Sequence, residues 1–184
     1  MESALAPRLE TERLILRPHA AGDFDAFSAM WRDPVVLEYT IREARSPQDA
    51  WMTMHRLLGS WPLLGYGFWA IALKTSDTLI GDAGFMDAMR PETPDKRTTP
   101  ELGYALAAAH HGKGYMTEAL AAVHDWLDRA MPGTEAFALI DDANPASIAV
   151  AQKFGYRFER RHDFNDRLGA LYTRKPLQER RPAD

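Results

Sequence analysis

The chain has 184 residues, a length that favours one domain, and its content of 46% hydrophobic and 26% charged residues is typical of a globular protein. A net charge of −4 without long basic runs argues against nucleic acid and anionic membranes as partners. The chain contains no cysteine, which excludes disulfides, thiolate catalysis and thiolate metal sites. With neither a signal-peptide pattern nor an apolar run of membrane-spanning length, we expect a cytoplasmic protein.

The first predicted elements are one strand and two helices. Residues 13–18 (RLILRP) indicate a short strand that ends at a proline. A helix should follow with Asp23 as its cap, because aromatic residues recur at helical spacing through Trp31. A second helix is expected after Ser46, where a proline occupies the first helical position and Asp49 follows three residues after the cap.

A β-hairpin and a long loop come next. Residues 66–74 and 78–86 are aromatic and aliphatic runs joined by a short polar turn, which predicts the hairpin. Residues 87–100 hold three prolines and no apolar period, so they predict a loop that is either functional or mobile. Residues 101–107 (ELGYALA) then resume as a strand.

The remaining segments alternate helices and strands. The helix after residue 114 should have one apolar face, formed by Met116, Ala119, Leu120, Val123, Trp126, Leu127 and Ala130. Residues 135–141 predict a strand, and a short helix should begin at its cap Asn144 and end at Gly155. Residues 156–161 and 168–174 predict the last strands. This order indicates an α+β fold, a partly antiparallel sheet with helices packed on its faces.

Two glycines flank Lys113 where the long apolar helix is about to begin. A strand, a glycine turn and a helix start together direct several free backbone N–H groups at one spot, where the helix dipole adds positive potential. Gly112 and Gly114 would let phosphate oxygens approach and would permit positive φ. The spacing matches neither the dinucleotide fingerprint nor the P-loop, so a plain glycine turn is the alternative.

Three motifs occur in order along the chain: ELGY at 101–104, GKGYxTEA at 112–119 and NxxSxxxxxxFGY at 144–156. With them, residues 8–174 resemble the GNAT superfamily of N-acetyltransferases, in particular the branch of ribosomal-protein N-terminal alanine and serine acetyltransferases. The resemblance implies one domain over residues 1–175, with a central, mostly antiparallel, twisted and splayed sheet and helices on both faces. Residues 176–184 would be a loose tail.

The resemblance also implies a site for acetyl-CoA. Its pyrophosphate would be cradled, mostly by main-chain N–H groups, by His111, Gly112, Lys113, Gly114, Tyr115 and Met116. The pantetheine arm would run along Tyr104, Ala105 and Leu106 like an added strand, with an amide near Leu106 free to polarise the thioester carbonyl. Asn144 would face the pantetheine as well as cap its helix.

The chain departs from the superfamily pattern at two positions. Ala109 stands where Gln or Arg often contacts phosphate, and Ala151 stands where many members have a tyrosine acid. Protonation of the departing thiolate would fall to Ser147, to Tyr156 or to water, although Ser147 also suits an ordinary first helical turn and Tyr156 suits the core. His110 and His111 could donate to phosphate or be solvated turn residues, and no metal site is expected.

Two carboxylates are candidates for the general base. Glu101 is the first, because the family often keeps a carboxylate at this strand position, although a solvated carboxylate at a strand start is the alternative. Asp82 is the second, because a carboxylate inside the apolar run LIGDAGF needs a partner or a function.

We therefore expect an acetyl-CoA-dependent enzyme that passes acetyl directly to a primary amine. At pH 7, deprotonation costs roughly 4.6 kcal/mol for a lysine side chain and about 1 kcal/mol for an α-amino group. A protein or peptide N-terminus is thus the preferred acceptor. The alternatives are a small amine, such as a polyamine, amino acid or aminoglycoside, and a non-catalytic acyl-CoA-binding module. The oligomeric state, including a homodimer, stays open.

Overall fold

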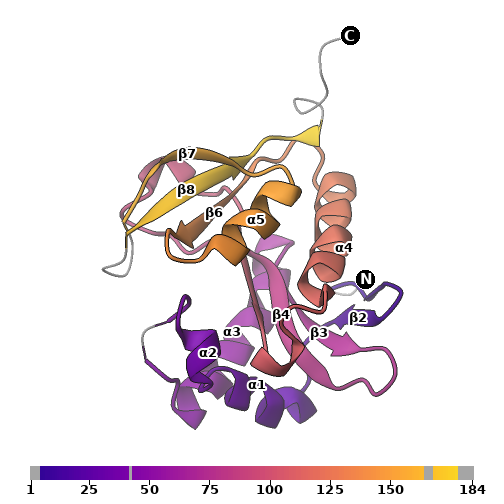
Figure 1. The fold of residues 1–184 in the computed structure, drawn as a ribbon. Coiled ribbons are helices and arrows are strands. Elements are labelled where there is room, and N and C mark those ends of the chain that lie inside the picture. The colour runs from indigo at the N-terminus through magenta and orange to yellow at the C-terminus, as the bar shows by residue number, and fades with distance from the viewer. Residues whose placement is uncertain (1–4, 42, 164–167, 178–184) are drawn as a thin grey trace. The chain divides into compact units, whose positions relative to one another are not determined.

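The computed structural model describes residues 5–41, 43–163 and 168–177, and the chain divides into two compact units (Figure 1). The first unit comprises Met1–Phe85 and Tyr104–Ala122, and the second comprises Met86–Gly103 and Val123–Asp184. Strand β5 and helix α4 are each divided between the two units. The two units are described separately below.

The first unit is built on an antiparallel sheet with the strand order β1-β2-β3-β4-β5. Its strands are β1 (Leu9–Glu10), β2 (Leu14–Arg17), β3 (Phe68–Leu73), β4 (Leu79–Met86) and the C-terminal half of β5 (Glu101–Leu106). The predicted hairpin is present, since β3 and β4 pair from Phe68 opposite Gly84 onward. After β5, the Ala107 amide donates to the Ile80 carbonyl at 2.8 Å, which fixes β5 beside β4.

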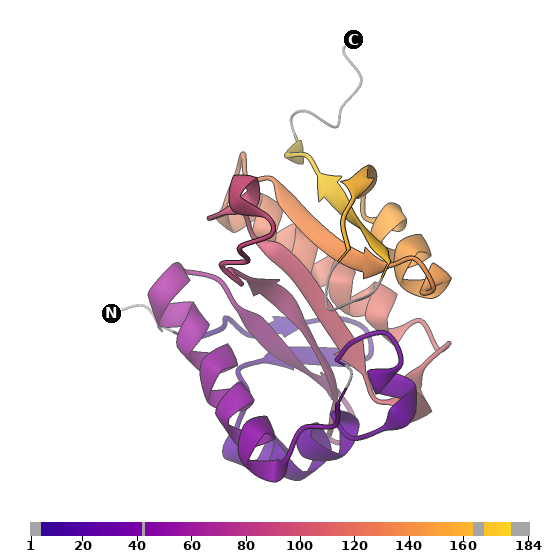
Figure 2. The same cartoon turned by 90° about the vertical axis from the view of Figure 1, so that its left-hand side faces the viewer.

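Three helices of the first unit are α1 (Phe24–Met30), α2 (Pro34–Leu37) and α3 (Pro47–Leu64), and Figure 2 shows α3 running beside the strands. Ser46 caps α3 as expected, because its hydroxyl accepts the Asp49 amide at 3.1 Å. The helix ends at Gly65, whose φ of 78° suits glycine. The helices and strands enclose a core cluster that contains Phe27, Met30, Val36, Ala50, Met54, Ala70, Leu79 and Ala105.

The predicted capping role of Asp23 is wrong. Asp23 stands at the N-cap position of α1, but its side chain makes no capping hydrogen bond there. Its carboxylate instead accepts the Ala20 amide at 2.7 Å and two N–H groups of Arg17 at 2.7 and 2.8 Å. A charged partner on the neighbouring strand outcompetes the helix amides, because bidentate guanidinium bonds are the stronger ones.

Two tryptophans lie against each other in the first unit. The Trp61 and Trp69 rings meet edge to face with centroids 4.6 Å apart. Each indole N–H is satisfied, by the Phe68 carbonyl at 3.0 Å and the Pro7 carbonyl at 2.7 Å respectively. Both side chains are buried, so the pair joins α3, β3 and the N-terminal segment.

The second unit has the strand order β5-β6-β8-β7. Its strands are β6 (Ala136–Asp141), β7 (Arg157–Arg161) and β8 (Gly169–Arg174), beside the N-terminal half of β5. Strands β6, β8 and β7 pair antiparallel, whereas β5 and β6 pair in parallel. Among the described residues, that parallel pairing is confined to Glu101 opposite Phe137.

Two helices complete this description: α4 (Tyr115–Ala130), which passes from the first unit into the second, and α5 (Pro145–Lys153). Asn144 caps α5 by accepting the Ser147 amide at 2.9 Å, as predicted. In the second unit, the buried Arg174 of β8 forms a bidentate pair with Asp128 of α4 at 2.9 and 2.6 Å.

The loop over residues 87–100 is held by ionic contacts within the second unit. It contains one 3-10 turn, Pro94–Lys96. The Lys96 ammonium donates to Glu135 at 3.0 Å, to Glu159 at 2.8 Å and to Thr173 at 3.3 Å. These bonds tie the loop to the residue before β6 and to strands β7 and β8.

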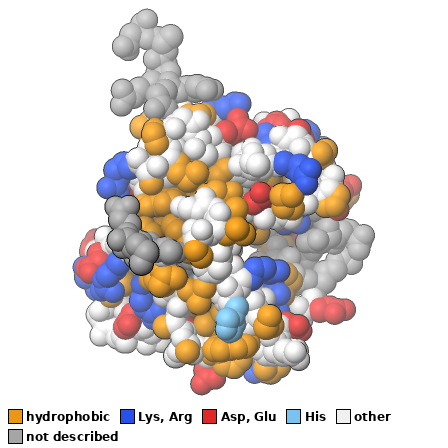
Figure 3. All heavy atoms as spheres, turned by 180° about the vertical axis from the view of Figure 1, so that it is seen from behind, with side chains coloured by type: hydrophobic (Ala, Val, Ile, Leu, Met, Phe, Trp, Pro, Cys, Tyr) orange, Lys and Arg blue, Asp and Glu red, His pale blue; other side chains and the backbone are white. Residues whose placement is uncertain are grey.

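The predicted fold class is confirmed as a mixed α/β fold with eight mostly antiparallel strands. The short elements β1 and α2 had no sequence signal, because two and four residues show no periodicity. Of the predicted tail, residues 178–184 lie outside the described part, and the single domain over 1–175 stays a prediction. No helix among the described residues is long and apolar enough to span a membrane. On the face in Figure 3, basic and acidic side chains are interspersed.

Candidate active site

The Gly-Lys-Gly turn has the backbone conformation that glycine alone adopts readily. Gly112 has φ of 70° and Gly114 has φ of 79°, both in the left-handed region. A Cβ added at position 112 would meet no atom within 4 Å, so the turn faces open space there. The turn follows a 3-10 helix, Ala108–His110, and leads directly into α4.

Free amides line this turn. Helix-start amides have no acceptor inside the helix, and the first bond into α4 runs from the Glu118 amide to the Gly114 carbonyl at 3.0 Å. Within the described part of the chain, the amides of residues 112–116 donate to no backbone carbonyl. They are therefore available to an anion at the positive end of the helix dipole.

Arg13, the residue before β2, makes several contacts with the turn and the start of α4. Its guanidinium donates to the Lys113 carbonyl at 3.1 Å and lies over the Tyr115 ring, 4.4 Å from the centroid. It also donates to Glu118 at 2.7 Å, and the same carboxylate accepts the Thr11 hydroxyl at 2.5 Å and the Arg13 amide at 2.7 Å. Glu118 thus ties the first turn of α4 to the chain ahead of β2.

Of the two histidines before the turn, His111 is exposed, as expected of a solvated residue, whereas His110 is half-buried. A ring nitrogen of His111 lies 2.8 Å from the Leu106 carbonyl, so the exposed ring is hydrogen-bonded to the end of β5. His110 is half-buried, with its ring centroid 5.9 Å from that of Tyr115. Burial, helped by the nearby Lys113 and His111, lowers the pKa of His110.

The proposed pantetheine strand lies directly beside β4. Ala105 and Leu106 are buried, and Tyr104 is half-buried. A Cβ at Gly81 would come within 2.4 Å of the Ala105 carbonyl oxygen, so only glycine allows the two strands to approach so closely. Asp82 is the next residue of β4.

Asp82 is the most unusual carboxylate of the first unit. Its side chain is 1% exposed, and its Oδ2 has no hydrogen-bond partner in the described structure. Burial raises the pKa of Asp82 to about 7, although the Trp31 indole and the charge of Arg45 oppose this shift. The carboxyl group therefore exchanges its proton near neutral pH.

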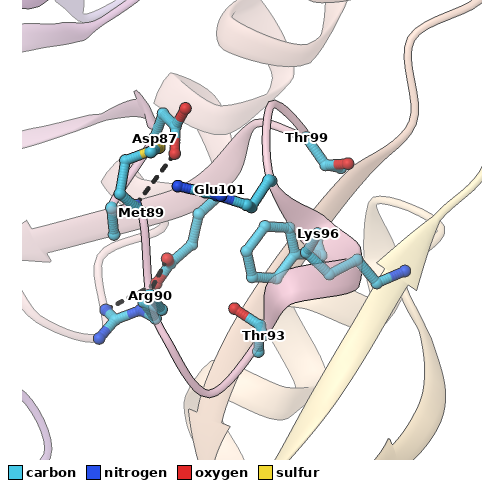
Figure 4. Close-up of a pocket in the computed structure, with 10 residues that line it drawn as sticks. Asp87, Met89, Arg90, Thr93, Lys96, Thr99 and Glu101 are labelled. Carbon is cyan, nitrogen blue, oxygen red and sulfur yellow. Dashed lines mark hydrogen bonds and ion pairs between the residues drawn. The ribbon is translucent and has the colours of Figure 1, made fainter.

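Glu101, the other candidate base, lies in the second unit and is fully engaged. Its two oxygens each accept an N–H of Arg90 at 2.9 Å, and its side chain is buried. Figure 4 shows this pair at a small pocket lined mainly by residues of the loop over 87–100 together with Glu101 and Phe137. Both oxygens of Glu101 are therefore engaged by one guanidinium group.

The remaining predicted residues lie on α5 and after it, in the second unit. Asn144 and Ser147 are half-buried in the cap and first turn of α5. Tyr156 is fully buried, and its hydroxyl lies 3.2 Å from a ring nitrogen of His124. Tyr156 is therefore a packing residue, as the sequence favoured.

Sequence reasoning missed the partners of these groups. Arg13, Arg45 and Arg90 are far from their partners along the chain, and single arginines carry no motif. Glu118 stands inside the quoted GKGYxTEA motif, which is the one signal that could have pointed to it. Within the described ranges, no group of three or more histidine, aspartate or glutamate residues is placed to hold a metal ion.

Comparison with known proteins now gives the family. The Acetyltransferase (GNAT) domain model matches residues 13–157. The chain is 29% identical over 173 residues to YkkB of Bacillus subtilis (strain 168), an uncharacterized protein, and the match covers 91% of this chain and 95% of YkkB. A solved GnaT-family acetyltransferase from Bordetella pertussis is 28% identical with a TM-score of 0.83, over 92% of this chain and 99% of that one.

The ribosomal-protein branch appears among the solved structures. RimL, the ribosomal L7/L12 α-N-protein acetyltransferase solved in complex with coenzyme A, has a TM-score of 0.75 at 18% identity, over 92% of this chain and 98% of that one. At this identity the match shows a shared fold. Because the family model covers most of the chain and the relatives match over nearly their whole lengths, the chain belongs to the GNAT family of N-acetyltransferases, which transfer acetyl from acetyl-CoA to an amine.

Proposed function

We propose that this N-acetyltransferase acts on the α-amino group of a peptide or protein N-terminus. Acetyl-CoA supplies the thioester, and the acetyl group passes directly to the amine; the chain has no cysteine that could carry the group as a thioester. Asp82 accepts the proton of the attacking amine. Ser147, or water, returns a proton to the departing thiolate.

The turn from His111 to Met116 holds the pyrophosphate of acetyl-CoA. The support for this is the pair of left-handed glycines, the open space at Gly112 and the free amides that follow. The pantetheine arm follows Tyr104, Ala105 and Leu106, with the amide near Leu106 polarising the thioester carbonyl. Asn144 and Ser147 are also proposed as cofactor contacts, as the family resemblance implies.

The observation that carries the choice of acceptor is the unpaired, buried carboxyl of Asp82. A base whose pKa is about 7 is matched to an α-amino group near 7.8, since the transfer is uphill by roughly 1 kcal/mol. For a lysine ammonium near 10.4 the same transfer is uphill by roughly 4.6 kcal/mol. Asp82 thus replaces Glu101 as the preferred base, because Arg90 occupies both oxygens of Glu101.

The cofactor half of the proposal is tested at Gly112. Gly112→Glu places a carboxylate in the open space where the phosphates would lie, so we expect acetyl-CoA affinity, measured by calorimetry, to fall by at least 100-fold. Gly133→Glu is the matched control, because Gly133 also has positive φ and open space around it. Equal affinity in the two variants would show that the phosphates bind elsewhere.

The acceptor half is tested by an amine screen. Release of the coenzyme A thiol is followed with a panel of peptides with free N-termini, the same peptides with blocked N-termini, polyamines and aminoglycosides. We expect turnover with the free peptides only. Turnover with small amines and none with peptides would assign the enzyme to the small-molecule class.

A further inference from the structure

Three side chains of the first unit form a polar cluster inside its apolar core. Trp31 follows α1, Arg45 precedes α3, and Asp82 lies in β4. The Arg45 amide donates to the Trp31 carbonyl at 3.2 Å, and the Arg45 guanidinium lies over the Trp31 ring, 5.3 Å from the centroid. Arg45 and Trp31 are also the two groups that stabilise the charged form of Asp82. We call these three residues the acceptor cluster.

Each member of the acceptor cluster has a buried polar atom that makes no well-aligned hydrogen bond in the described structure, although the Trp31 indole lies close enough to Asp82 to stabilise its charged form. These atoms are the Trp31 indole Nε1, the Arg45 Nε and the Asp82 Oδ2. An unsatisfied buried polar atom costs about 1–3 kcal/mol, so three in one place call for a ligand or ordered water. The core packed around them is apolar, with Phe27 and Met30 as neighbours of Trp31.

The members of the cluster differ in burial. Asp82 is almost completely buried, whereas Trp31 and Arg45 are half-buried. A ligand that reached Asp82 past these two side chains would meet their N–H donors before the carboxyl oxygen. The cluster therefore presents an ordered set of two donors and one acceptor.

This set matches one class of amine. An amine nitrogen donates to Asp82, while a carbonyl or carboxylate oxygen on the neighbouring carbon accepts from Trp31 and Arg45. A polyamine has no such oxygen, and it would leave both N–H groups unpaired while placing a cation beside Arg45. Sites that pair a substrate oxygen reject analogues that lack it, because the site is left with unpaired donors.

We propose that Trp31 and Arg45 are specificity-determining residues that read the oxygen adjacent to the acceptor amine, so that the enzyme selects α-amino acyl compounds. The inference rests on the proposed function, in which Asp82 accepts the amine proton. It names two residues that touch the acceptor and a chemical feature that every acceptor shares. Free amino acids and peptide N-termini both carry this feature.

The test compares glycinamide with propargylamine, two small primary amines of similar basicity of which only the first has the adjacent oxygen. We expect kcat/KM for glycinamide to exceed that for propargylamine by about 100-fold or more. Trp31→Phe removes the indole N–H and should reduce this ratio by about 10-fold through glycinamide alone. Arg45→Met should reduce the ratio in the same way. Trp51→Phe is the control, because Trp51 lies at an exposed position of α3, and it should leave the ratio unchanged.

A second readout does not depend on turnover. In protein labelled with ¹⁵N-tryptophan, the Trp31 indole resonance, identified by its loss in Trp31→Phe, should shift with glycinamide and not with propargylamine. If the resonance does not respond, or if the variants slow both amines equally, the specificity inference is overturned even where acetylation proceeds. A selective shift without any turnover would support the inference and contradict the proposed function.

Two further ligands, compared with glycinamide, distinguish free amino acids from peptide N-termini as the acceptor. Glycine, glycinamide and a tetrapeptide that begins with glycine all carry the amine and the adjacent oxygen. Preference for the tetrapeptide assigns the cluster to peptide N-termini, and preference for glycine assigns it to free amino acids. Equal failure of all three to shift the Trp31 resonance would overturn the inference.

Discussion

At the scale of single residues, the two candidate bases differ in what surrounds them. Glu101 has a bidentate counter-charge in Arg90, and Asp82 has one oxygen with no partner in the described structure. Both residues lie in apolar stretches of strand, and the local sequence does not show which of the two carboxylates has a counter-charge. The difference arises from Arg90, a loop residue whose contact with Glu101 no spacing rule predicts.

The Arg90 pair makes a testable claim about stability. Arg90→Met leaves the buried Glu101 carboxylate without its partner, and we expect the free energy of unfolding in urea to fall by about 2–3 kcal/mol. Arg129→Met is the control, because Arg129 and Asp125 form an exposed pair, and the loss should stay below about 0.5 kcal/mol. Equal losses in the two variants would mean that the Arg90–Glu101 pair contributes no more to stability than an exposed ion pair.

At the scale of elements, the start of α4 depends on the segment before β2. Glu118 accepts three hydrogen bonds from Thr11 and Arg13, and Arg13 also holds the Lys113 carbonyl. Main-chain amides bind an anion well only if the turn that carries them is rigid before binding. Arg13 is therefore a positioning residue for the proposed phosphate site.

Arg13→Gln should loosen this turn. We expect the Kd for acetyl-CoA, measured by calorimetry, to rise by about 5- to 10-fold. Arg8→Gln serves as the comparison, since Arg8 forms an exposed pair with Glu10 nearby. An unchanged Kd in Arg13→Gln would show that the turn keeps its shape without the Arg13 contacts.

Local signals predicted the elements well where capping and periodicity agree. Ser46 and Asn144 cap their helices as the sequence indicated, and the glycines of the turn adopt the left-handed conformation. The prediction for Asp23 failed, because Arg17 on a neighbouring strand captures its carboxylate. Of the candidate site, the turn could be predicted from a local motif, whereas the acceptor cluster could not, because it joins three segments distant in sequence.

At the scale of the whole molecule, two buried groups act on stability in opposite directions as pH changes. Burial lowers the pKa of His19 from 6.5 to about 4, and Arg17 adds to this shift while Asp23 opposes it. As pH falls from 6.5 to 4, His19 is protonated in the unfolded chain and stays neutral in the folded one. The free energy of unfolding therefore falls by about 3 kcal/mol over this range.

Asp82 has the reverse effect over an overlapping range. Its folded pKa of about 7 lies above the unfolded value of 3.8, so its contribution is full below pH 3.8 and is lost as pH rises toward 7, by about 4 kcal/mol. Between pH 4 and 6.5 the two slopes therefore nearly cancel. The charged groups that face Asp82 and His19, Arg45 and Arg17 among them, stay charged throughout.

Single substitutions should reveal the contribution of each group to the pH dependence of stability. In His19→Phe, the remaining Asp82 contribution should make stability fall, relative to the parent protein, as pH rises from 4.5 to 6.5. In Asp82→Asn, the remaining His19 contribution should make stability rise, relative to the parent protein, over the same pH range. Urea unfolding at three pH values measures both, and curves parallel to the parent's in either variant would contradict the assigned protonation.

The edge-to-face contact between Trp61 and Trp69 offers a built-in optical probe. Indoles 4.6 Å apart couple their strong electronic transitions, and such coupling gives a far-ultraviolet circular dichroism couplet that vanishes when the rings separate. Four of the five tryptophans lie in the first unit, and Trp126 is the one in the second. Loss of the couplet would report melting of the first unit alone, so spectroscopy on unlabelled protein can ask whether the acceptor cluster loosens before the rest of the chain.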